Sequence, residues 1–161
     1  MNSYMQGKWS WVEGAHGARN GLINELSDAD LAFSMGGQTM TLGALCREFG
    51  EIEHSYVESL KTLKHDWSYH NQEAGLENSV SKLQAWYQTL DSQMKETVAA
   101  FSDEDLKQMV ERDAAGGGFP ASIELQLEIY LQALAIFAGK FSIYLRAMDK
   151  PLPADFLAFI G

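Results

Sequence analysis

Apolar residues recur at intervals of three and four positions along four long segments of the chain. This spacing places the apolar side chains on one face of a helix, so each segment is predicted to form an amphipathic helix. The predicted helices cover residues 3–26, 41–64, 78–101 and 122–146. The sequence contains no alternating strand pattern of any length and no internal repeat. It therefore predicts an all-α four-helix bundle that forms one domain over residues 1–161.

The ends of the helices and the connections between them are also visible in the sequence. Thr41 is in position to cap the second helix, and Ser122 opens the fourth. The predicted connections are a short helical turn at 27–30, a polar connection at 65–77 anchored by Trp67, a shorter capped helix at 102–112 and a glycine-rich loop at 114–119.

Composition excludes several classes of partner. The formal net charge is -10, and a chain this acidic is repelled by nucleic acids and by anionic membrane surfaces. No apolar run reaches the length of a membrane span. Cys46 is the single cysteine, so no internal disulfide can form, and no signal peptide is visible at the N-terminus. These features favour a cytoplasmic protein without a nucleic-acid or membrane partner.

Two segments carry a family resemblance. Residues 133–146, ALAIFAGKFSIYLR, are followed by Pro151 and Pro153, and residues 41–60 read TLGALCREFGEIEHSYVESL. They resemble the last and the second helix of the DinB/YfiT-like family. The resemblance implies a DinB/YfiT-like four-helix bundle. For members with a complete site it also implies metal-dependent hydrolase or thiol-dependent transferase chemistry.

The resemblance also locates the family's metal site. In that family one histidine of the second helix and two of the last helix bind a divalent metal. The corresponding positions here are Glu48, Ala133 and Phe137. The side chains of alanine and phenylalanine cannot donate an electron pair to a metal, and one carboxylate alone holds a divalent ion weakly. We therefore expect a degenerate site with no metal and no cofactor.

Other polar residues fall near this predicted site. Lys140 lies on the same side of its helix as Phe137, and it either pairs with Glu48 in place of the metal charge or extends to solvent. His16 lies on the inward stripe of the first helix and Tyr130 lies beside that of the fourth. His16 is either a core residue with a hydrogen-bond partner or part of a cavity between helices. The predicted ligand-binding residues are Glu48, Ala133, Phe137, Lys140, His16 and Tyr130.

Three functions remain open at this point. The first is a metal-free bundle that binds a small molecule or a protein partner. The second is an enzyme, either a metal-dependent hydrolase or a thiol-dependent transferase, that uses a relocated metal site or no metal. The third is a structural subunit without a pocket. The four Trp and eight Phe residues are an apolar surplus and, with the resemblance, they predict a homodimer that associates through helix faces.

Overall fold

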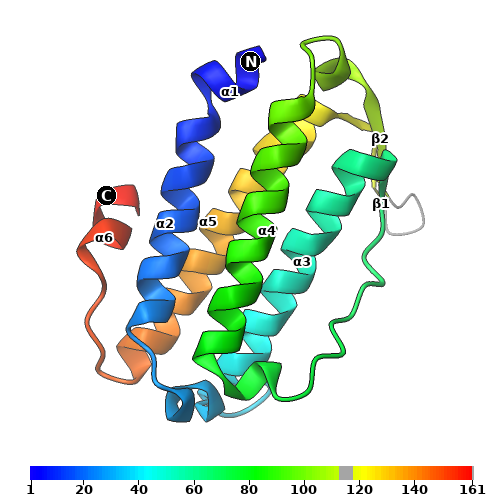
Figure 1. The fold of residues 1–161 in the computed structure, drawn as a ribbon. Coiled ribbons are helices and arrows are strands. Elements are labelled where there is room, and N and C mark those ends of the chain that lie inside the picture. The colour runs from blue at the N-terminus through cyan, green and yellow to red at the C-terminus, as the bar shows by residue number, and fades with distance from the viewer. Residues whose placement is uncertain (113–117, 161) are drawn as a thin grey trace.

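Four long helices form the body of the molecule in a computed structural model that describes residues 1–112 and 118–160 (Figure 1). They are α2 (Trp9–Asn24), α3 (Leu42–Thr62), α4 (Val80–Ala100) and α5 (Ile123–Ala147). Helix α3 packs against α4 and α5, and α2 packs against α5 and, over a smaller area, against α4. The predicted all-α four-helix bundle is therefore confirmed.

Hydrogen bonds fix the ends of these helices where the sequence placed them. The Thr41 hydroxyl accepts a hydrogen bond from the backbone N–H of Ala44, and the Ser122 hydroxyl accepts one from Leu125. Each bond satisfies one of the backbone donors that a helix start leaves unpaired. The first predicted helix is instead divided into α1 (Ser3–Gly7) and α2, because the backbone leaves the helical conformation at Lys8 (φ -125°, ψ -19°).

A small sheet lies at one end of the bundle and was not predicted. Its strands are β1 (Lys64–His65), β2 (Met109–Arg112) and β3 (Ala121–Ser122), in the order β1-β2-β3. Strand β2 is parallel to β1 and antiparallel to β3. Strands of two to four residues are too short for an alternating pattern to be visible in the sequence.

The prediction of a helix at 102–112 is wrong, because part of this segment forms the short strand β2. Ser102 and Asp105 make the expected capping bonds, but only one 3-10 turn follows, η3 (Asp105–Lys107). The backbone then bonds to its neighbours, since Gln108 accepts from Ile123 and Glu111 donates to Leu63. Of the loop predicted at 114–119, residues 114–117 lie outside the described residues.

The remaining segments outside the four long helices contain three short helices. These are η1 (Asp28–Ala32), η2 (Leu76–Asn78) and α6 (Ala154–Ile160). The polar connection after α3 is held by the buried side chains of His65 and Leu76, whereas the predicted anchor Trp67 is 46% exposed. Helix α6 was not predicted; it packs against α2 and buries Phe156 completely.

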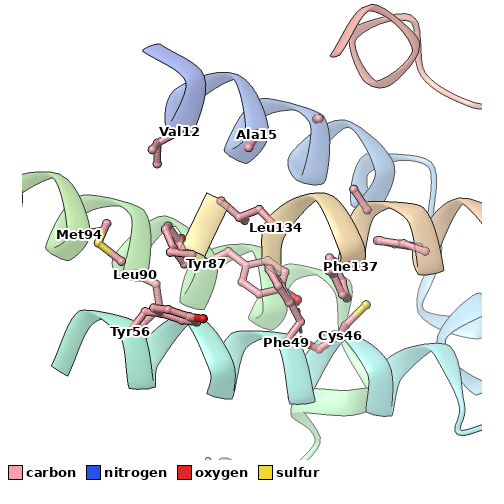
Figure 2. Packing of buried hydrophobic residues seen from close by; sticks show 14 of the residues in the cluster. Val12, Ala15, Cys46, Phe49, Tyr56, Tyr87, Leu90, Met94, Leu134 and Phe137 are labelled. Atoms are coloured by element: carbon pink, nitrogen blue, oxygen red, sulfur yellow. Dashed lines mark hydrogen bonds between the residues drawn. The ribbon is translucent and has the colours of Figure 1, made fainter. Parts of the chain in front are cut away.

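The core lies between the four helices and is rich in aromatic rings (Figure 2). Tyr87 donates a hydrogen bond to the carbonyl of Cys46 (2.6 Å). Cys46 is buried, and burial raises the pKa of its thiol to about 12. Helix α4 approaches α3 so closely that a Cβ atom at Gly50 would lie 2.4 Å from the ring of Trp86. Among the described residues, no helix is both long and apolar enough to cross a membrane.

Candidate functional site

A groove of about 140 Å³ runs between α3 and α5 and contains four of the predicted site residues. Its lining residues are Leu45, Glu48, Phe49, Ile52, Ala133, Ile136, Phe137 and Lys140. A second pocket of about 260 Å³ adjoins it and shares the side chains of Leu45 and Lys140. The groove is therefore lined by all three positions that correspond to the metal ligands of the resembled family, 48, 133 and 137.

Phe137 forms an inner wall of this groove. It is 3% exposed, and its ring stacks on that of Phe49, with centroids 3.8 Å apart and planes 11° apart. Figure 2 shows the two side chains facing each other from α5 and α3. Phe141 also packs near Phe137, with ring centroids 5.6 Å apart and planes tilted by 60°. The phenyl ring therefore belongs to the core at a position where the resembled family has a metal ligand.

Glu48 and Lys140 lie at the rim of the groove, and both are exposed. No salt bridge joins these two described side chains, so the predicted Glu48–Lys140 ion pair is absent. Both charged groups are exposed to water, and an ion pair between exposed groups adds little to the free energy of folding.

His16 and Tyr130 do not line the groove. They belong to a polar cluster, named here the buried cluster, that is made of His16, Arg19, Glu53, Asp91 and Tyr130 and draws on all four long helices. His16 Nε2 and the Tyr130 hydroxyl are 2.7 Å apart, and His16 Nδ1 lies 3.2 Å from Asp91 Oδ1. Of the two alternatives stated for His16, the structure shows a buried residue with a hydrogen-bond partner, away from the other predicted ligand-binding residues.

Arg19 is the centre of the buried cluster. Its guanidinium donates to Glu53 through one terminal nitrogen and to Asp91 Oδ2 (2.7 Å) through the other. Arg19 and Glu53 are completely buried, and Asp91 is largely covered. The Tyr130 hydroxyl donates a further hydrogen bond to Glu53 Oε1 (3.3 Å). The second oxygen of Glu53 is buried without a hydrogen-bond partner.

The sequence matches no protein-family model and no curated protein. The fold, by contrast, does match solved structures. One is a DinB-like protein, YjoA, from Bacillus subtilis: the TM-score is 0.69 at 12% identity, over 89% of this chain and 92% of that one. The chain has a DinB-like fold. At this identity the match establishes the fold alone, so the site has to be judged on its own residues.

Burial controls protonation in the buried cluster of this DinB-like fold. Burial and, to a smaller extent, the charge of Arg19 lower the pKa of His16 to about 4, although Asp91 opposes this, so the imidazole is neutral at pH 7. Burial raises the pKa of Glu53 to about 7, although Arg19 pulls it down. Burial alone would lower the pKa of Arg19, but the carboxylates of Glu53 and Asp91 hold this pKa above its ordinary value. One guanidinium therefore bonds to two carboxylates, and the pKa of the deeper one, Glu53, is raised by its burial.

Three members of the buried cluster could in principle hold a metal ion. His16, Glu53 and Asp91 each offer one ligand atom, and these atoms all lie within 4.8 Å of one another. An imidazole and two carboxylates suit zinc or another divalent transition metal. However, Arg19 already bonds to both carboxylates, and its permanent charge would repel a cation between them. The cluster fits a metal only if Arg19 moves away.

Sequence reasoning found His16 and Tyr130 but missed Glu53 and Asp91. A signal existed, because Glu53 stands four residues after Phe49 on the apolar stripe of α3. A carboxylate at such a position requires a buried partner. Arg19, on the inward face of α2, was the matching cation. Asp91 directly follows the buried Leu90 on α4, and the spacing of apolar residues in α4 does not predict that Asp91 faces the core.

Proposed function

We propose that this DinB-like chain is a metal-independent binding protein that takes a small, largely apolar molecule into the groove between α3 and α5. One observation carries the proposal: positions 48, 133 and 137 line a common space, and two of them, Ala133 and Phe137, present hydrocarbon to it instead of metal ligands. A site of this kind favours an apolar ligand over an ion.

The shape of the groove supports a ring or a short chain as the ligand. A volume of about 140 Å³ resembles that of apolar protein cavities that bind one benzene-sized molecule. The adjoining pocket offers a continuation past Leu45 toward Met40 and Ile143. Lys140 stands where the two spaces meet. A ligand with an apolar body and an anionic group would therefore match both spaces.

Anilinonaphthalene sulfonate, an aromatic probe with one negative charge, provides a direct test. Its fluorescence should rise on binding to the native protein and saturate with a single site. Ala133→Arg should abolish this site because the new side chain fills the groove. Ala135→Arg is the matched control, since Ala135 is an exposed residue of α5 that does not line the groove. Equal binding by both variants, with circular dichroism showing that both are folded, would refute the proposal.

A second candidate function rests on the buried cluster. The convergence of His16, Glu53 and Asp91 would suit an enzyme, a metal-dependent hydrolase or thiol-dependent transferase with its metal relocated from the position seen in the resembled family. Elemental analysis of the purified protein separates the two candidates. The binding-protein proposal expects no stoichiometric metal and no change in melting temperature with a chelator. Tightly bound metal whose removal lowers the melting temperature would favour the enzyme.

A further inference from the structure

Several polar side chains meet at the end of the bundle where the small sheet lies. His65 of β1 and Arg112 of β2 are neighbours in the parallel pairing. Gln126 of α5 connects them: its amide nitrogen donates to His65 Nδ1 (2.7 Å) and to the Ser59 hydroxyl (2.8 Å), and its oxygen accepts from Arg112. Gln126 is completely buried. Because the amide occupies Nδ1 as an acceptor, the proton of the neutral imidazole is on Nε2.

These contacts leave one buried hydrogen-bond donor, His65 Nε2, without an acceptor. His65 is 4% exposed, and its Nε2 atom has no hydrogen-bond partner. Arg112 uses one terminal nitrogen for Gln126, and no salt bridge joins it to a carboxylate in the part of the chain that the structure describes. The edge of the guanidinium formed by Nε and the other terminal nitrogen is the edge that a carboxylate pairs with in two parallel bonds. Arg112 is only partly buried, but the buried unpaired donor of His65 is of a kind that is rare in proteins and points to a missing acceptor.

Aromatic side chains surround the same guanidinium. Its central carbon lies 5.9 Å from the ring centroids of Tyr56 and Trp67, and 5.8 Å from that of Phe119. Trp67 also stacks on the ring of His65 at 3.9 Å. Trp67 is 46% exposed and Phe119 53%. The corner therefore combines donors with two aromatic faces that solvent reaches, and large exposed rings of this kind are typical of ligand-binding surfaces.

We propose that this corner binds a small aromatic carboxylic acid, with the carboxylate on Arg112 and His65 and the ring against Trp67 and Phe119. The carboxylate supplies the acceptor that His65 Nε2 lacks, and its planar group matches the planar guanidinium of Arg112. Gln126 lies in the first turns of α5, where the helix dipole also favours a negative charge. The site is separate from the groove between α3 and α5, so it does not depend on the function proposed there.

Benzoate is the probe for this site, and benzamide is its neutral control with nearly the same shape. In nuclear magnetic resonance titrations of the native protein, benzoate should shift the side-chain signals of Arg112 and His65 and saturate. Benzamide should bind at least about tenfold more weakly, because it lacks the charge that Arg112 recognises. Equal affinities for the two would overturn the proposal, as would shifts that are confined to other residues.

Variants test the role of Arg112 itself. Arg112→Gln should weaken benzoate binding at least about tenfold, whereas Arg146→Gln, which removes an exposed arginine at the other end of α5, should leave it unchanged. If Arg112→Gln does not fold, Arg112→Lys keeps the charge without the planar fork and should weaken binding as well. Equal losses in the Arg112 and Arg146 variants, or inorganic phosphate that binds as tightly as benzoate, would show unspecific attraction of anions and overturn the assignment.

Discussion

Replacing Phe137 by alanine should strongly destabilise the protein. The ring is 3% exposed, stacks on Phe49 and contacts Phe141. A buried Phe→Ala substitution costs about 3–5 kcal/mol, the sum of the lost transfer free energy and the cavity left behind. Phe137 borders the groove, so water can enter part of the new space and the lower end of that range applies. We expect a loss of about 3 kcal/mol, which lowers the melting temperature by about 6–12 °C for a chain of this length.

Urea unfolding followed by circular dichroism measures this loss. Ile136→Ala is the matched control, because the preceding residue on α5 is 61% exposed and its truncation should cost less than about 0.5 kcal/mol. Phe137→Leu should give an intermediate value, since it keeps most of the apolar volume but loses the stacking on Phe49. A cost below about 1 kcal/mol for Phe137→Ala, or a cost equal to that of Ile136→Ala, would refute the placement of this ring in the core.

Four further predictions follow from the described contacts. Burial raises the pKa of Glu53 from 4.5 to about 7, so the stabilising contribution of its protonated form is complete below pH 4.5 and is lost as the pH rises through 7. The free energy of unfolding of the native protein, relative to that of Glu53→Gln, should therefore fall over this pH range. A difference in urea unfolding that does not change with pH would contradict this prediction. A double-mutant cycle of Glu48→Gln and Lys140→Met should give a coupling below about 0.5 kcal/mol, because no ion pair forms; a larger value would show a pair in solution. Replacing Glu48, Ala133 and Phe137 together by histidine should create a zinc site that raises the melting temperature only in the variant, and a folded variant that ignores zinc would show that the positions do not converge. Light scattering at micromolar concentration should give a dimer, and a mass of 17.9 kDa at all concentrations would exclude it.

The sequence by itself determined the helices and their inward faces. Apolar spacing is a local property, and it correctly predicted the four long helical segments, whose apolar faces form the core. The caps at Thr41 and Ser122 are equally local, because each side chain bonds to a backbone group three residues away. The family resemblance, carried by two helices, led to the DinB-like fold that the structural match supports.

Only the tertiary structure decided which polar groups meet. Residues 102–112 contain a helix-capping signal, but β2 forms because β1 and β3 offer backbone partners from distant parts of the chain. Arg19, Glu53 and Asp91 come from three different helices, and each alone is an isolated charge in the sequence. Their pairing depends on the rotation and height of those helices in the bundle, which are set by the packing of the whole core. A local pattern can mark Glu53 and Arg19 as inward-facing, but it does not show which distant groups they contact, and for this reason the buried cluster and the Arg112 corner became visible only in the folded chain.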